Sequence, residues 1–337
     1  MLLPAPPSLD QIARNIPAVN TISSDTRRPF WSVMIPTYNC GNYLRRTLES
    51  VLCQDPGPEK MQLEVVDGCS THDDPETVIN EVAKGRVSFH RIPRNEGAAN
   101  TFNACIHRSV GHWVHIIHGD DQVRPGFYDA YESAIYAFPT SVMVLGGYSV
   151  IDEYNNFIRD RPRDDVDGVG IIPDFASRQA FKQLASFPAV VVRRSSYEAA
   201  GGFCTWFSHV VDMDMWLRIG LLGDVAGVHE TYALYREHRQ SLSSQAIMNG
   251  ESIRERVLLT LINRERLRRS DWRCDSRAWK SEVAEFAHNC AWDADRAAST
   301  FGRLVQASWA FRVNPSMESL WFLAKSWLKH RIRPTDH

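Results

Sequence analysis

Residues 114–121 read Val114-His115-Ile116-Ile117-His118-Gly119-Asp120-Asp121, an apolar run that ends in two adjacent carboxylates. The β-branched residues suit a buried strand, and Gly119 permits a turn out of the sheet. The acid pair would then lie just beyond the carboxyl end of a strand, where open α/β sheets bind ligands. Neighbouring carboxylates repel each other unless a cation lies beside them, and Mg²⁺ and Mn²⁺ accept such oxygen ligands. A solvated Asp-Asp turn is the alternative.

Strands and helices alternate around this stretch. Strands are predicted at 30–35, where Pro36 ends the first one, and at 63–66, 87–91 and 114–117, with helices in the intervals. This alternation predicts an α/β fold with a mainly parallel central sheet flanked by helices. Right-handed crossovers then bring Pro36, Asp67 and Asp120, which follow three of these strands, to one edge of the sheet.

The remainder of the chain has a looser pattern. A helix is predicted at 126–138, short strands at 142–145, 190–192 and 232–235, and a charged loop at 152–174. Another helix begins near Val211, and helices fill the chain from about residue 250, including 251–268 and 316–330. The predicted organisation is a Pro-containing, loosely ordered extension over 1–28, an α/β domain over 30–245 and a helical C-terminal region over 246–337.

Composition excludes several classes of protein. A net charge of −2 and a pI near 6.6 give no electrostatic footprint for nucleic acid. The seven cysteines form no Cys-x-x-Cys pair, which argues against a disulfide framework and a zinc site and favours the reducing cytoplasm. The first residues lack a signal peptide pattern, and no stretch reaches the roughly 18 apolar residues that span a bilayer.

Five motifs in a fixed order resemble those of family 2 glycosyltransferases with the GT-A fold: Ser32–Asn39, Val65–Thr71, His118–Asp121, Val211–Asp212 and Tyr235–His238. The resemblance covers roughly residues 30–243. It implies an inverting enzyme that moves a sugar from a nucleotide-diphosphate donor, with UDP-sugars the commonest, to a hydroxyl acceptor. Such enzymes use Mn²⁺ or Mg²⁺ and serve polysaccharide or glycolipid synthesis.

The resemblance assigns a donor pocket residue by residue. Pro36, Thr37 and Tyr38 would line the pocket for the base and ribose. Asp67 would accept a hydrogen bond from the base, and Asp120 would hold the ribose or assist the metal.

The resemblance also assigns the reacting end of the site. Asp121 would ligate the metal directly, His238 would approach the metal, and Arg236 would lie beside the diphosphate. Asp212 would be the general base that takes the proton of the acceptor hydroxyl. A structural alternative for Asp212 is an acid favoured by the helix dipole, a contribution of about 0.3–1 kcal/mol.

Two other functions stay open at this point. A catalytically silent nucleotide-sugar or glycan-binding module is one, because Gly68, His118 and Val211 replace acids that are common in the family. A nucleotidyltransferase is the other, although Pro36–Asn42 contains no Gly-rich, basic phosphate loop. The acceptor, the sugar and the oligomeric state have no signal in the sequence.

Two further features have competing interpretations. His112, His115 and His118 are three residues apart, and residues so spaced in a strand face opposite sides, so we expect His115 to be packed and His118 only to border the acids. The last helix carries Leu320, Leu323, Trp327 and Leu328 on one side and basic residues at its end. It would either pack against the chain or rest on an anionic membrane at the inner face.

Overall fold

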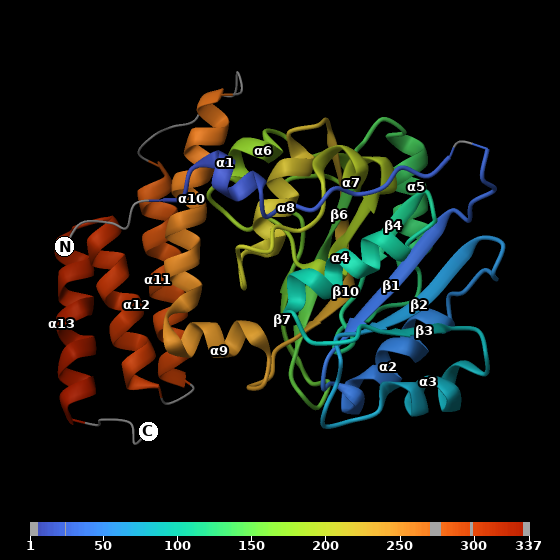
Figure 1. Ribbon diagram of the computed structural model, residues 1–337. Coiled ribbons are helices and arrows are strands. Elements are labelled where there is room, and N and C mark those ends of the chain that lie inside the picture. Colours follow the sequence, from blue (N-terminus) through green and yellow to red (C-terminus); the bar gives the residue numbers. More distant parts are fainter. Residues whose placement is uncertain (1–5, 24, 270–277, 297–298, 333–337) are drawn as a thin grey trace. The chain divides into compact units, whose positions relative to one another are not determined.

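The computed structural model describes residues 6–23, 25–269, 278–296 and 299–332 (Figure 1). Contacts divide the chain into two units. The sheet unit comprises residues 15–176 and 184–237, and the helical unit comprises the described parts of 1–14, 177–183 and 238–337. The helical unit therefore begins at His238 rather than at residue 246.

The sheet unit is a mixed α/β structure. Its sheet has the order β3-β2-β1-β4-β9-β6-β10-β5, with β7 on β6 and β8 on β10. The strands are β1 (Trp31–Thr37), β2 (Met61–Asp67), β3 (Ser88–Arg91), β4 (Trp113–Ile116), β5 (Gln122–Val123), β6 (Met143–Ile151), β7 (Phe157–Arg161), β8 (Val169–Ile171), β9 (Val190–Arg193) and β10 (Val225–Arg236). The pairs within β3-β2-β1-β4 and the pair β6-β10 are parallel.

Helices cover the parallel part of the sheet. They are α2 (Gly41–Leu52), α3 (Pro75–Ala83), α4 (Ala98–Arg108), α5 (Phe127–Ala137), α7 (Arg194–Ala200) and α8 (Val211–Gly220), with the short 3₁₀ turn η1 (Phe187–Ala189) and α6 (Phe175–Gln179). Apolar residues of α2, α3 and α5 form one core with Val33 and Ile35 of β1. Helix α4 packs on β1, β2 and β4.

Three details differ from the sequence prediction. Strand β1 continues through Pro36 to Thr37. Proline is tolerated here because β4 ends at Ile116, opposite Met34, so no residue of β4 pairs with Pro36 and its missing N–H leaves no strand hydrogen bond unmade. The predicted loop 152–174 contains β7 and β8, which pair antiparallel with β6 and β10. Strand β9 lies antiparallel between β4 and β6.

The N-terminal extension is also more ordered than predicted over its described residues. It contains α1 (Leu9–Ala13), with a capping box between Ser8 and Gln11. Within the sheet unit, the carbonyl of Asn15 accepts from Thr205 N at 2.9 Å, and the carbonyl of Asn20 accepts from Arg194 Nη2 at 3.1 Å. These backbone contacts fix a segment that has no periodicity of its own.

The helical unit contains α9 (Leu242–Asn249), α10 (Glu251–Arg269), α11 (Ala278–Arg296), α12 (Thr300–Val313) and α13 (Met317–Ile332). The helices predicted at 251–268 and 316–330 are confirmed as α10 and α13. Among the described helices, none combines the length and apolar character that crossing a bilayer requires.

The turn before β4 depends on a glycine. A methyl group on Gly111 would lie 2.5 Å from the Ser32 amide nitrogen, which belongs to the backbone of β1. We expect Gly111→Ala to lower the free energy of unfolding by about 1–3 kcal/mol, because a strand must shift. Gly170→Ala is the control, since its methyl group would meet Val166 at 3.5 Å. Urea denaturation measures both; equal stabilities of the two variants would contradict the close approach.

His115 is packed as predicted and makes stability depend on pH. Its Nδ1 lies 3.2 Å from Tyr128 Oη and its Nε2 lies 3.1 Å from the Pro188 carbonyl oxygen. Burial lowers the pKa of His115 to about 3, so the unfolded chain binds more protons below pH 6.5 and stability falls as pH decreases. From pH 7 to 5, we expect His115 to cost about 2 kcal/mol of folding free energy.

His115→Gln tests this expectation, because glutamine retains a donor and an acceptor but does not titrate in this range. Urea unfolding at pH 7 and pH 5 should show a smaller loss of stability in the variant. The same loss in both proteins would show that His115 is not the titrating group.

Candidate active site

The ends of three strands meet at one edge of the sheet unit, as predicted. Strand order reverses between β1 and β4, and such a switch point is where α/β sheets bind ligands. Gly119 N donates to the Pro36 carbonyl oxygen at 2.9 Å, and Gly68 N donates to the Thr37 carbonyl oxygen at 2.8 Å. Thr37 is buried, whereas Tyr38 is 46% exposed. Pro36, Thr37, Tyr38, Asp67 and the acid pair therefore share one region.

Residues 118–121, here called the acid loop, are held in place by hydrogen bonds from α2. The buried hydroxyl of Thr47 lies 2.6 Å from the Asp121 carbonyl oxygen and 3.0 Å from that of Gly119. Gly119 permits the close approach, because a methyl group there would lie 2.9 Å from Cys40 Sγ and 3.0 Å from Thr37 Oγ1. The loop is therefore fixed against β1 and α2 by contacts that leave its acid side chains to other partners.

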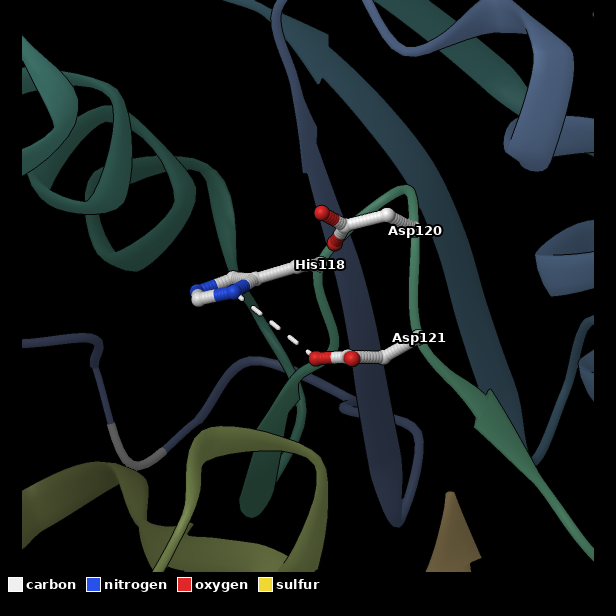
Figure 2. A group of neighbouring side chains, drawn as sticks. All are labelled: His118, Asp120 and Asp121. Atoms are coloured by element: carbon white, nitrogen blue, oxygen red, sulfur yellow. Dashed lines mark ion pairs between the residues drawn. The ribbon is translucent and has the colours of Figure 1, made fainter. Parts of the chain in front are cut away.

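His118, Asp120 and Asp121 project to the same side of the acid loop (Figure 2). One ligand atom of each lies within 4.8 Å of the others. Asp121 is 1% exposed, and its Oδ2 has no hydrogen-bond partner within the part of the chain that the structure describes. Burial and the charge of Asp120 raise the pKa of Asp121 well above its usual value. Burial lowers the pKa of His118, so this imidazole is neutral at pH 7. The cluster offers a divalent cation two carboxylates and a ring nitrogen.

Arg236, at the end of β10, positions the acid loop. Its backbone N donates to Asp121 Oδ1 at 2.9 Å, and its Nε donates to the Asp120 carbonyl oxygen at 2.7 Å. Its Nη1 donates to the Asp152 carbonyl oxygen at 2.7 Å, and its guanidinium lies over the Tyr43 ring. The predicted contact between Arg236 and a diphosphate stays a prediction, for which Nη2, a buried atom without a hydrogen-bond partner, is the remaining donor.

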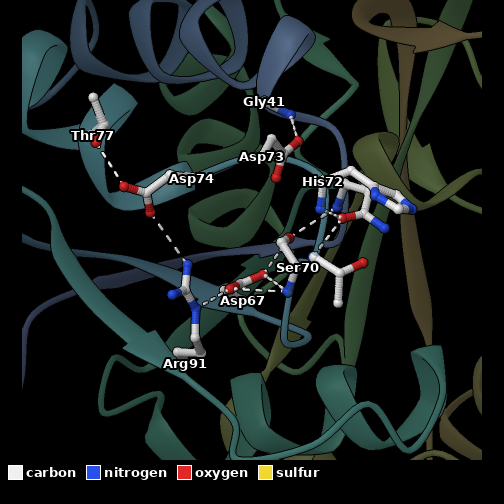
Figure 3. A network of polar contacts seen from close by, with 10 residues as sticks. Gly41, Asp67, Ser70, His72, Asp73, Asp74, Thr77 and Arg91 are labelled. Carbon is white, nitrogen blue, oxygen red and sulfur yellow. Dashed lines mark hydrogen bonds and ion pairs between the residues drawn. The ribbon is translucent and has the colours of Figure 1, made fainter.

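Asp67 is enclosed by protein groups (Figure 3). Its side chain has no exposed surface, and its Oδ2 accepts from Arg91 Nε at 2.6 Å. Its Oδ1 accepts from Ser70 Oγ at 2.6 Å and from Ser70 N at 3.0 Å. The predicted hydrogen bond from a donor base to Asp67 stays a prediction, and it requires one of these contacts to open. Arg91 was not predicted as a site residue.

The same network joins the loops that follow β1 and β2 (Figure 3). Asn39 Oδ1 accepts from the backbone N of Thr71 at 2.8 Å and of His72 at 3.0 Å. Asp73 Oδ2 accepts from Gly41 N at 2.6 Å, at the start of α2. A methyl group on Gly68 would lie 3.1 Å from Thr101 Oγ1, so a side chain at residue 68 would require Thr101 to shift slightly.

Asp212 lies in the first turn of α8, as predicted, and is 7% exposed. Its charge contributes to the raised pKa of Tyr148, for which burial is the larger cause. Asp214 on the same helix is fully buried and accepts from Arg218 Nε at 2.9 Å. Asp212 Oδ1 accepts from the backbone N of Met213 at 2.8 Å, so the two acids of α8 have different surroundings.

An aromatic cluster connects the acid loop to α8. The His118 ring stacks on Phe102, with centroids 5.1 Å apart, and lies 4.4 Å from the Phe187 ring. Phe187 in turn packs against Trp216 of α8 at 5.4 Å. Trp216 follows Asp212 by four residues, so both lie on one side of the helix. Phe187 therefore contacts both the His118 ring of the acid loop and the Trp216 ring of α8.

His238 belongs to the helical unit, and its predicted role as a metal ligand stays a prediction. Thr47 and Arg91 were not predicted as site residues. No local signal marks either of them, because each acts on a residue remote in sequence. His118, which was expected only to border the acids, lies with them in one group of candidate ligands.

Curated relatives cover different shares of the chain. An uncharacterized protein of Mycobacterium tuberculosis is 27% identical over 73% of this chain and 79% of its own length. The succinoglycan biosynthesis protein ExoO of Rhizobium meliloti is 29% identical over 33% of this chain and 29% of its own length.

Two solved structures share the fold. Staphylococcus aureus TarS 1-349, in complex with UDP-GlcNAc, has a TM-score of 0.53 and 15% identity, and the match covers 89% of this chain and 91% of that one. The mannosyltransferase PcManGT of Pyrobaculum calidifontis, in complex with GDP-Man and Mn²⁺, has a TM-score of 0.52 and 20% identity over 92% and 82%. The GT-A fold expected from the sequence is confirmed.

The motifs that form the site coincide with a family assignment. Residues 32–198, which include β1, Asp67 and the acid loop, match the sequence model of Glycosyl transferase family 2. Asp212 and Arg236 lie beyond this segment and are joined to it by the aromatic cluster and by the contacts of β10. The chain belongs to glycosyl transferase family 2.

Proposed function

We propose that this protein is an inverting glycosyltransferase. It moves a sugar from a nucleotide-diphosphate sugar, a UDP-sugar, to a hydroxyl of a saccharide or lipid-linked saccharide. The observation that carries this proposal is the Asp120–Asp121 pair, held at the switch point of the sheet with a buried oxygen of Asp121 that has no hydrogen-bond partner. Burial and the charge of Asp120 disfavour the ionised form of Asp121, and Arg236 opposes both effects. A cation that also binds a diphosphate would stabilise both carboxylates.

The residues of the acid loop fit a divalent cation. Asp121 and Asp120 would hold Mn²⁺ or Mg²⁺, which would neutralise charge that develops on the leaving diphosphate. Arg236 and Thr47 fix the loop backbone, so the carboxylates are positioned before a ligand arrives. Preorganisation of this kind lowers the cost of binding charge in the transition state.

Asp212 is the proposed general base. Inversion requires the nucleophile to approach the anomeric carbon from the side opposite the leaving diphosphate. Asp212 is on a different element from the acid loop and on the side of α8 that carries Trp216. Its carboxylate would take the proton of the acceptor hydroxyl as the new glycosidic bond forms, which typically contributes about 10²–10⁴-fold to the rate.

The donor and acceptor classes rest on the comparisons. TarS was solved with UDP-GlcNAc, which supports a nucleotide-sugar donor. PcManGT was solved with GDP-Man and Mn²⁺, which supports such a donor and a divalent cation. The succinoglycan biosynthesis relative supports a polysaccharide product. A silent nucleotide-sugar or glycan-binding module is the alternative, favoured by the replacement of common family acids at Gly68, His118 and Val211.

Replacement of the base separates these functions. We expect Asp212→Asn to lower sugar transfer by about 10²–10⁴-fold, because the amide cannot take a proton, while nucleotide binding is retained. Asp224→Asn is the control, since it removes an exposed acid near the end of the same helix. Transfer or donor hydrolysis is measured with the UDP-sugar that, in the presence of Mn²⁺, raises the melting temperature most.

Undiminished activity of Asp212→Asn would remove Asp212 from the role of base. Stabilisation by nucleotide sugars without transfer or hydrolysis in the unchanged protein would favour the binding module. Absence of stabilisation by every nucleotide sugar would contradict both.

Membrane contact is part of the same proposal, because the acceptor class includes lipid-linked saccharides. Helix α13 exposes apolar side chains at positions that share one face: Met317, Leu320, Trp321, Trp327 and Leu328. Lys325 lies over the Trp321 ring at 3.7 Å, and Arg331 lies over the Trp327 ring at 4.6 Å. Tryptophan paired with basic residues suits the interface of an anionic bilayer.

We expect the full chain to sediment with vesicles that contain anionic lipid, and less so at high salt. Replacement of Trp321 and Trp327 by alanine should reduce the bound fraction several-fold. Trp292→Ala is the control, because Trp292 is 50% exposed on α11. Equal sedimentation of all three proteins would exclude α13 as the contact.

A further inference from the structure

The His118 ring is directed at the acid pair. Its Nδ1 lies 3.8 Å from Asp121 Oδ2, which is too long for a hydrogen bond. Asp121 Oδ1 is already used by Arg236 N, so Oδ2 is the oxygen that faces the ring (Figure 2). A buried carboxylate oxygen and an imidazole nitrogen thus face each other without bonding.

The separation suits two ligands of one cation. Ligands about 2.1 Å from a metal lie about 3.0 Å apart at right angles and about 3.6 Å apart at 120°. The 3.8 Å between His118 Nδ1 and Asp121 Oδ2 is within a few tenths of an ångström of this range. One candidate ligand atom of each residue lies within 4.8 Å of the other two. Two ligands on opposite sides of a metal are about 4.2 Å apart, so a small inward shift of the side chains would bring all three atoms to binding distance of one cation.

The position of the imidazole is set by packing. Phe102 stacks on it with an interplanar angle of 8°, and Phe187 covers it at 4.4 Å. The Nε2 atom is buried and has no hydrogen-bond partner among the described residues. A ring packed between two phenyl groups keeps its orientation through these contacts, so Nδ1 stays directed at Asp121 Oδ2.

We propose that His118 is a metal ligand alongside Asp120 and Asp121, and that it biases the site toward Mn²⁺ over Mg²⁺. This inference rests on the proposed function, since it concerns the cation that would hold the donor diphosphate. Mg²⁺ prefers a shell of oxygen ligands, whereas imidazole nitrogen suits later divalent metals better. The nitrogen ligand therefore makes the preference a property of this loop rather than of acid pairs in general.

The test is spectroscopic and does not need turnover. The full chain is loaded with Mn²⁺ and UDP, and pulsed electron paramagnetic resonance detects ¹⁴N coupled to the bound ion. We expect ¹⁴N coupling in the unchanged protein and its loss in His118→Gln. We also expect His118→Gln to bind Mn²⁺ at least about 10-fold more weakly than the unchanged protein. His238→Gln tests the other histidine predicted near the metal, and His112→Gln, which replaces an exposed histidine without a predicted site role, is the matched control and should keep the signal. His118→Asp should bind Mn²⁺ but show a smaller ratio of Mn²⁺ to Mg²⁺ affinity.

The outcomes separate the two proposals. Mn²⁺ that binds in an Asp121-dependent manner without ¹⁴N coupling, or with coupling that survives in His118→Gln, would overturn the role of His118 and leave the metal-held diphosphate intact. Coupling lost only in His238→Gln would assign the nitrogen to His238 and also overturn it. Failure of Mn²⁺ to bind with or without UDP would overturn both proposals.

Discussion

Two neighbouring carboxylates that share one short turn are the constraint on which the site depends. Their repulsion grows with burial, as the raised pKa of Asp121 shows. The surrounding protein holds this arrangement through the backbone: Thr47 bonds the loop carbonyls, Gly119 allows contact with β1, and Arg236 donates to both the loop and Asp121. Two nitrogens of the Arg236 guanidinium donate to backbone carbonyl oxygens and not to the carboxylates, so this side chain mainly fixes the backbone of the acid loop. These backbone contacts hold the two carboxylates close together, although their repulsion is unfavourable. A bound cation would reduce that repulsion.

Much of the sheet could be predicted from the sequence, because the alternation from Trp31 to Ile116 is local information. Apolar periods define each strand and helix, and crossover handedness then orders the strands. The prediction fails for β7 and β8, which are short and largely exposed and pair with β6 and β10. Their existence depends on pairing with strands whose register no local window contains. The true length of β10, which begins at Val225, escapes for the same reason.

The candidate site divides in a similar way. Asp120, Asp121 and Asp212 follow recognisable motifs, and the structure places them at a strand end and a helix start. Thr47 acts on residues more than seventy positions away, so no spacing rule could find it. His118 was undervalued because the alternation of a strand was extended to it, although β4 ends at Ile116. Beyond that residue the chain turns, and the rule that separates residues three apart no longer applies.

The two ends of the site are built on different physics. At the base end, Asp67 is paired with Arg91 and bonded to Ser70, and Asn39 and Asp73 tie the neighbouring loops together. Charge is balanced there, so recognition of a base would depend on shape and on the exposed ring of Tyr38. At the metal end, charge is unbalanced and geometry is fixed by packing against Phe102 and Phe187. The proposed nucleotide-diphosphate donor would join these halves, because its base is nearly neutral and its diphosphate is strongly anionic. The diphosphate would then supply electrostatic affinity through a cation, and the base would fix the position of the donor along the edge of the sheet.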